Sequence, residues 1–97
     1  MDAAANAGRA LAQQLTIVNR KGLHARASAR FVRMAECFEA EIKVTRDGTT
    51  VSGGSIMGLM MLGAAMGDSI LIICDGDDAE SSLATLVELV ETKFGEE

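Results

Sequence analysis

The chain has 97 residues, 48% of them hydrophobic, and a formal net charge of −5. This length and composition suit a single folded domain and exclude a disordered segment. An acidic chain with three phenylalanines as its only aromatic residues lacks the basic face and stacking rings of nucleic-acid-binding proteins, so we expect no nucleic-acid partner.

No apolar run approaches the length needed to cross a bilayer, so we expect no membrane insertion. The two cysteines, Cys37 and Cys74, lie far apart in the sequence and have neither the spacing of a disulfide framework nor that of metal ligands. We therefore expect two reduced thiols in or near the core of a cytoplasmic protein, with no metal and no cofactor.

Residues 1–10 are rich in alanine and lack the apolar run of a secretory signal. We interpret them as a flexible N-terminal extension before a domain of residues 11–97. The first strand is predicted at residues 15–19, LTIVN, a β-branched run closed by Arg-Lys-Gly. The hydrophobic period then changes, which predicts a helix that begins at Ala25 or Arg26, directly after His24. Its predicted buried face consists of Ser28, Phe31, Val32, Ala35 and Phe38.

The segment EIKVTRDGTTVS is predicted to form a hairpin, because Asp47-Gly48 between alternating residues is a strong two-residue turn signal. A short helix follows, with Ser55 as its N-cap and Gly63 as its C-terminal stop. Its predicted core residues are Leu59 and Leu62.

Residues 69–74, SILIIC, are almost entirely apolar, as expected for a central strand covered by helices. The apolar spacing over residues 79–94 predicts the last helix. Asp77 is predicted to cap its start together with Glu80, and Lys93 and Gly95 fit its last turn and its stop. The order β-α-β-β-α-β-α favours an α+β fold, an open-faced β-sandwich with a four-stranded, mostly antiparallel sheet and three helices on one face.

The only histidine, His24, lies directly before the first predicted helix. The unpaired N–H groups at a helix start, here beginning with the backbone N–H of Ala25, and the positive end of the helix dipole attract anions. These surroundings disfavour an imidazolium and leave a ring nitrogen available as a nucleophile. They would also stabilise a phosphoryl group on that nitrogen, together with Arg26. Further candidate cations are Arg20, Lys21 and Arg30.

The residues alone leave other interpretations of His24 open. A single histidine in a loop is most often exposed and without a function. A catalytic triad would need a carboxylate, and none lies near in the sequence, so only the fold could bring one close. A metal site built from one histidine and two scattered cysteines is not favoured.

The segments GLHARASARFVRMAECF and SIMGLMMLGAAMGDSILIICDGDDAESSLATLVELVETKFGE resemble HPr, the histidine-containing phosphocarrier family of the bacterial phosphoenolpyruvate-dependent phosphotransferase system. The resemblance spans residues 11–96 and implies the same open-faced fold. It implies that His24 is phosphorylated on Nδ1 and that Arg26 helps to bind the phosphoryl group. It also implies that Enzyme I donates this group and Enzyme IIA proteins accept it, so that the chain is a relay and not an independent turnover enzyme.

Ser55 matches a serine that an ATP-dependent HPr kinase/phosphorylase modifies in some relatives, so the resemblance makes it a candidate regulatory phosphosite. A role as a helix cap alone is the alternative. Two positions depart from the family pattern: Ala27 stands where most relatives have proline, and Gly54 where many have lysine. We expect the first to leave the chemistry intact, whereas the second removes a cation that could pair with a phosphoserine.

By the same resemblance a candidate partner surface lies near His24, and methionine suits surfaces that fit several partners. Core positions for some of its apolar members are an equally open interpretation. The members of this surface are Ile56, Met57, Met60, Arg30 and Arg33. We expect a monomer. The alternative function is a regulatory binding module, of a nitrogen-related or serine-phosphorylated branch, that docks to partner proteins and does not serve sugar transport.

Overall fold

The computed structural model describes residues 10–96. Its elements are β1 (Ala10–Thr16), α2 (Ala25–Ala35), β2 (Glu41–Arg46), β3 (Thr49–Ser52), α3 (Ile56–Met61), β4 (Ser69–Asp75), α4 (Ala79–Glu91) and a short 3₁₀ turn, η1 (Lys93–Gly95). The predicted order of strands and helices is confirmed. No helix in the described range is long and apolar enough to span a membrane.

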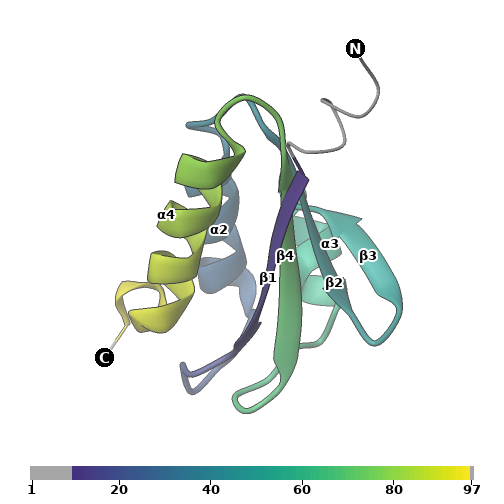
Figure 1. Ribbon diagram of the computed structural model, residues 1–97. Coiled ribbons are helices and arrows are strands. Elements are labelled where there is room, and N and C mark those ends of the chain that lie inside the picture. The colour runs from purple at the N-terminus through teal and green to yellow at the C-terminus, as the bar shows by residue number, and fades with distance from the viewer. Residues whose placement is uncertain (1–9, 97) are drawn as a thin grey trace.

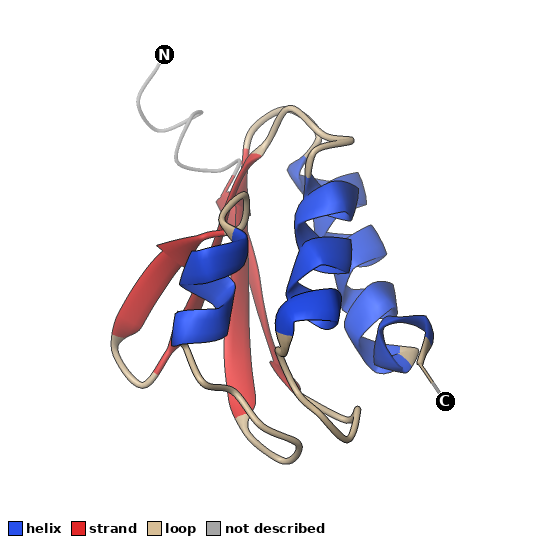
Figure 2. Cartoon of the chain, turned by 180° about the vertical axis from the view of Figure 1, so that it is seen from behind, coloured by secondary structure: helices blue, strands red, loops and turns tan. Residues whose placement is uncertain are grey.

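The four strands form one sheet in the order β1-β4-β2-β3, and every neighbouring pair is antiparallel. The three α-helices cover the same face of this sheet (Figures 1 and 2). Strand β4 lies between β1 and β2, which confirms the central strand predicted from its apolar sequence. The fold is therefore the predicted open-faced β-sandwich.

The core lies between the sheet and the helices, because alternate strand residues and one face of each helix point toward it. Leu59 and Leu62 belong to it, as predicted. The largest fully buried apolar side chains are Phe31, Phe94, Ile17, Leu59, Ile70, Ile72 and Leu86. Of the two thiols, Cys74 is buried as expected, whereas Cys37 is exposed just after α2, which corrects half of the prediction.

The residues predicted for the hairpin turn and for the two ends of α3 adopt the expected conformations. Asp47 and Gly48 both have positive φ, at 50° and 82°, as a two-residue hairpin turn requires. The hydroxyl of Ser55 accepts a hydrogen bond from the backbone N–H of Gly58 at 2.9 Å and so caps α3. Gly63 has a φ of 64° just beyond the end of this helix.

The first strand was predicted at the wrong residues. Strand β1 begins at Ala10 and ends at Thr16, not at residues 15–19. All of its residues except Leu15 are exposed, so its small and polar side chains carry little strand signal, and pairing with β4 supplies the strand instead. The predicted extension of residues 1–10 lies outside the described residues apart from Ala10, which opens β1.

The predicted cap of the last helix was also wrong. Asp78, and not Asp77, is the N-cap residue of α4, and its side chain does not cap the helix. The Asp78 carboxylate instead accepts hydrogen bonds from the backbone N–H groups of Glu39 and Ala40, each at 2.8 Å. This aspartate therefore ties the start of α4 to the segment that follows α2.

The C-terminal end of α4 comes earlier than predicted, at Glu91. Lys93 and Phe94 have positive φ, at 63° and 56°, and Phe94 is buried. Burying this large ring turns the chain back toward α2, where the Arg30 guanidinium donates a hydrogen bond to the Phe94 carbonyl. The turn η1 thereby directs residue Glu96 toward the beginning of α2.

Candidate functional site

His24 is the N-cap residue of α2, with an extended backbone (φ −74°, ψ −179°). The loop before it is held by a hydrogen bond from the Leu23 N–H to the Ala64 carbonyl, at 3.0 Å. Gly22 has a φ of +62°, and a Cβ there would lie 2.2 Å from the same carbonyl oxygen. Only glycine fits this close approach, so Gly22 sets the tight turn that presents His24.

A carboxylate contacts the His24 ring. Oε2 of Glu96 lies 2.6 Å from Nε2 of His24, and Oε1 of Glu96 accepts a hydrogen bond of 3.1 Å from Nδ2 of Asn19. The side chains of His24 and Glu96 are 24% and 18% exposed. The fold thus supplies the nearby carboxylate that the local sequence around His24 lacks.

Electrostatics keep this carboxylate ionised. Burial alone would raise the pKa of Glu96, but hydrogen bonds from His24 and Asn19, with the charges of His24 and Arg30, bring the pKa below its ordinary value of 4.5. An ionised carboxylate can only accept hydrogen bonds, so Nε2 of His24 carries the proton in this contact. In a neutral ring Nδ1 is then the unprotonated nitrogen, which is the atom that a nucleophile needs.

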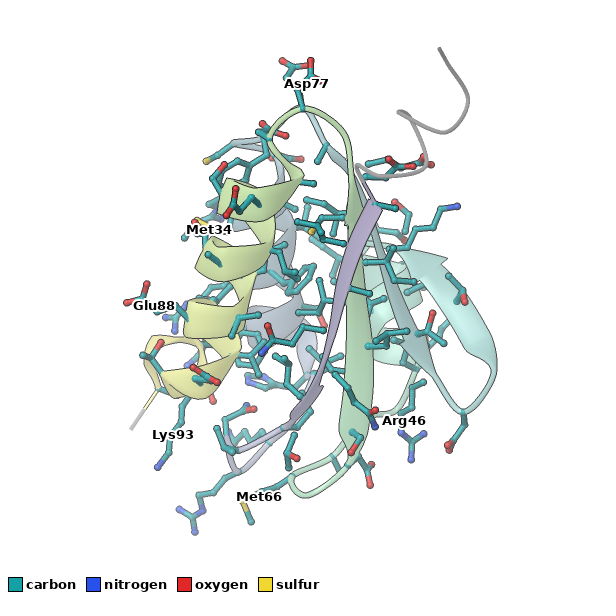
Figure 3. All side chains as sticks on the ribbon, viewed as in Figure 1. Met34, Arg46, Met66, Asp77, Glu88 and Lys93 are labelled. Atoms are coloured by element: carbon teal, nitrogen blue, oxygen red, sulfur yellow. The ribbon has the colours of Figure 1, made fainter. Side chains whose placement is uncertain are left out.

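His24 also borders a cavity of about 350 Å³, and the described residues that line it are Arg20, Lys21, His24, Arg26 and Glu96. Three cations of an acidic chain therefore gather around one imidazole. Figure 3 shows that Asp77 lies at the end of the molecule opposite Lys93 and Met66. The cavity has the positive charge that an incoming phosphoryl group requires.

The helix start adds backbone donors to this cavity. The His24 side chain makes no capping hydrogen bond to α2, and the first hydrogen bond of the helix runs from the Ser28 N–H to the His24 carbonyl, at 2.9 Å. The N–H groups of the first turn, beginning with Ala25, are therefore outside the helical ladder. Arg26 is exposed in the same turn, and Ala27, at the position of the usual proline, is buried.

The residues predicted for partner binding lie on two helices. On α3, Ile56 and Met60 are each 40% exposed and Met57 is 68% exposed, so these side chains point outward as predicted. On α2, Arg33 is exposed, whereas Arg30 is partly buried and bonded to the Phe94 carbonyl. The geometry thus gives Arg30 a structural contact in addition to any part in docking.

Two residues of the site escaped the sequence analysis. Glu96 lies 72 positions from His24, and no spacing or motif connects them. Asn19 was predicted as the end of a strand, yet its side chain is buried and bonded to Gly22 and Glu96. A polar residue in an apolar run before a glycine turn was the one available signal. Within residues 10–96 no group of three or more His, Cys, Asp or Glu side chains is placed to hold a metal ion.

Comparisons with known proteins find similar sequences over most of the chain. The family model described as "PTS HPr component phosphorylation site" matches residues 11–92. The phosphocarrier protein HPr of Neisseria meningitidis is 45% identical over 86 residues, which cover 89% of this chain and 97% of the relative. The phosphocarrier protein NPr of Shewanella violacea is 40% identical over 86 residues, covering 89% of this chain and 94% of the relative.

Solved structures show the same fold. The crystal structure of HPr-C-His from Thermoanaerobacter tengcongensis superposes with a TM-score of 0.86 at 42% identity, covering 90% of this chain and 98% of that one. Sequence and fold agree over most of the chain. The chain therefore belongs to the HPr family of phosphocarrier proteins of the bacterial phosphotransferase system.

Proposed function

We propose that this protein accepts a phosphoryl group from Enzyme I on Nδ1 of His24 and passes it to Enzyme IIA proteins. The observation that carries the proposal is the His24 ring itself, which borders a cavity with three cations while Glu96 occupies its other nitrogen. The bond from the donor's phosphorus to its leaving nitrogen breaks as the bond to Nδ1 forms. The reverse exchange on a IIA protein restores the free ring.

The site favours this exchange by position and charge. Arg26 and the open N–H groups of the first turn of α2 would bind the phosphoryl oxygens of the phosphorylated state. Since phosphoryl transfer needs little covalent chemistry from a protein, alignment and charge stabilisation account for most of the rate. The His24 side chain is 24% exposed, so a donor protein and then an acceptor protein can reach its ring.

The test is incubation with phosphoenolpyruvate, magnesium and Enzyme I, followed by intact-mass measurement and acid treatment. We expect one acid-labile phosphoryl group on the wild-type protein and none on His24→Ala. Ser55→Ala is the matched control, because it lies outside the His24 cavity and should accept the group at the wild-type rate. An acid-stable modification, or labelling of His24→Ala, contradicts the proposal.

We further propose that Ser55 is a regulatory phosphosite for an HPr kinase/phosphorylase. Its hydroxyl is partly buried and caps α3, and a phosphate there would place negative charge directly beside the exposed Ile56 and Met57. Incubation with ATP and such a kinase should label the wild-type protein and leave Ser55→Ala unlabelled. A kinase that labels neither protein would leave Ser55 with its capping role alone.

The candidate partner surface is proposed to receive both Enzyme I and IIA proteins. Its exposed apolar members on α3 and the cation Arg33 on α2 suit a partner face with an apolar centre and acidic rim. Met57→Asp should raise the KM of Enzyme I for this protein, whereas Met61→Asp, at a more exposed position of the same helix, serves as the control. Equal changes in KM for the two substitutions would show that the partner surface lies elsewhere on the protein.

A regulatory branch is the second candidate function, because the relative named NPr is nearly as similar as the relatives named HPr. The same phosphorylated protein offered to sugar-specific and nitrogen-related IIA proteins decides between the two. A docking module that does not use histidine would keep its regulatory activity in the His24→Ala variant, whereas a phosphoryl relay would lose its activity. We place the reaction in the cytoplasm, with the protein acting as a monomer.

A further inference from the structure

Asn19 lies beside the site with only 1% of its surface exposed. Its Nδ2 donates hydrogen bonds to the Gly22 carbonyl, at 2.9 Å, and to Oε1 of Glu96, at 3.1 Å. The other carboxylate oxygen of Glu96 contacts Nε2 of His24. One amide group is thus bonded both to the turn that precedes the histidine and to the carboxylate that contacts its ring.

The orientation of this amide is determined by its two acceptors. If the amide were reversed, Oδ1 of Asn19 would face a carbonyl oxygen and a carboxylate oxygen, which repel it. In the observed orientation Oδ1 is buried and has no hydrogen-bond partner among the described residues. A buried unpaired acceptor lowers the stability of the fold. The amide therefore keeps the two hydrogen bonds that Nδ2 donates, although Oδ1 is left without a partner among the described residues.

The Glu96 side chain depends on these contacts for its position. Backbone contacts hold the turn before it, where Arg30 donates to the Phe94 carbonyl. Within residues 10–96 the hydrogen-bond partners of the carboxylate are Asn19 and His24. Of these two partners, His24 is the ring to be oriented, so Asn19 is the one that holds the Glu96 carboxylate in place. Glu96 can then orient the His24 ring.

We propose that Asn19 is a positioning residue for phosphoryl transfer. It aligns the Glu96 carboxylate so that Nε2 of His24 keeps its proton and Nδ1 remains the nucleophilic atom. It acts through Glu96 and the Gly22 turn and touches no phosphoryl group. The expected change in kcat rests on the proposed function, whereas the effect of Asn19 on the tautomer of the His24 ring does not depend on that function.

The test compares Asn19→Ala and the isosteric Asn19→Asp with Gln14→Ala, which removes an exposed amide from β1. The nitrogen chemical shifts of the unphosphorylated His24 ring report its tautomer. We expect predominantly Nε2–H in the wild type and Gln14→Ala, and a mixture of tautomers in both Asn19 variants. With Enzyme I, kcat should fall about fivefold with KM nearly unchanged, because the side chains on α3 are unaltered.

A double-mutant cycle separates positioning from a general loss of stability. If Asn19 acts through Glu96, Asn19→Ala should change the His24 tautomer and kcat little further in a Glu96→Ala background. Wild-type tautomer populations in Asn19→Ala, an unchanged kcat, or fully additive losses overturn the proposal. If Asn19→Ala does not fold, Asn19→Asp decides. A wild-type protein that takes no phosphate from Enzyme I refutes the proposed function, while the tautomer comparison still decides the role of Asn19.

Discussion

Nε2 of His24 lies 2.6 Å from Oε2 of Glu96, so the C-terminal end of the chain completes a site that begins 72 positions earlier. This contact leaves a single ring nitrogen for chemistry. In the proposed reaction the carboxylate would also stabilise the positive charge that the ring acquires when Nδ1 takes up a phosphoryl group. The rate of phosphoryl transfer should therefore depend on a residue outside the local GLHAR motif.

Glu96→Ala should lower the rate at which His24 accepts a phosphoryl group by about tenfold, since a hydrogen bond to a charged group contributes about 1.5–3 kcal/mol and this site is partly exposed. Initial rates with Enzyme I and phosphoenolpyruvate measure the effect. Glu91→Ala, which removes an exposed carboxylate at the end of α4, should retain the wild-type rate. Equal rates for all three proteins would show that the carboxylate has no part in transfer.

The same contact predicts a dependence of stability on pH. The pKa of Glu96 is lowered in the folded protein, so its contribution to stability is present above the ordinary glutamate pKa and is lost as the pH falls through the folded value. The difference in Tm between the wild type and Glu96→Gln should shrink as the pH is lowered from about 6 to about 3. Thermal melts followed by circular dichroism measure it. A difference that is constant or grows on acidification contradicts the assigned direction.

Local signals explain which parts of the fold could be predicted. Asp47-Gly48 specifies its turn through its own φ preferences, and Ser55 caps α3 with its own hydroxyl, so both are visible in a short window of sequence. Strand β1 was predicted at the wrong residues because it is an exposed edge strand. Its pairing with β4 outweighs its weak strand propensity.

The candidate site also has one part that local sequence predicts and another part that only the tertiary fold brings into place. His24 and Arg26 lie two positions apart in the sequence and were identified from the motif and the helix start. Glu96 reaches the ring only because burying Phe94 turns the chain back after α4. That turn is a tertiary event, since Lys93 and Phe94 adopt positive φ against their local preference. Contacts of this kind have no signature in a single sequence.

The two thiols should differ in reactivity. Cys37 is exposed, whereas Cys74 is 0% exposed. Burial, as the larger cause, and the nearby charge of Asp78 raise the pKa of the Cys74 thiol. Because the thiolate is the reactive form, one equivalent of a thiol reagent should react with the native protein and a second only after unfolding. Cys37→Ser should abolish the native reaction. Rapid native labelling of Cys74 would show that its strand opens readily.

Substitutions at Gly22 and Gly48 distinguish the cost of backbone strain from the cost of crowding. Both glycines have positive φ, but of the two only Gly22 is packed against another segment. Among the described residues a Cβ at Gly48 meets nothing within 4 Å, so Gly48→Ala should cost only the conformational strain, about 1–2 kcal/mol. At Gly22 the Cβ would lie 2.2 Å from the Ala64 carbonyl oxygen. Gly22→Ala should therefore cost about 3 kcal/mol or more, because the loop must move as well.

The displaced loop should also affect function. Moving Gly22 breaks the Leu23–Ala64 hydrogen bond that holds the His24 loop, so Gly22→Ala should slow phosphorylation of His24 at temperatures far below its Tm, whereas Gly48→Ala should not. Urea denaturation gives the stabilities and Enzyme I assays give the rates. Equal losses of stability in the two variants would mean that the loop accommodates a Cβ beside Ala64, and a normal rate in Gly22→Ala would mean that the position of this loop does not limit transfer.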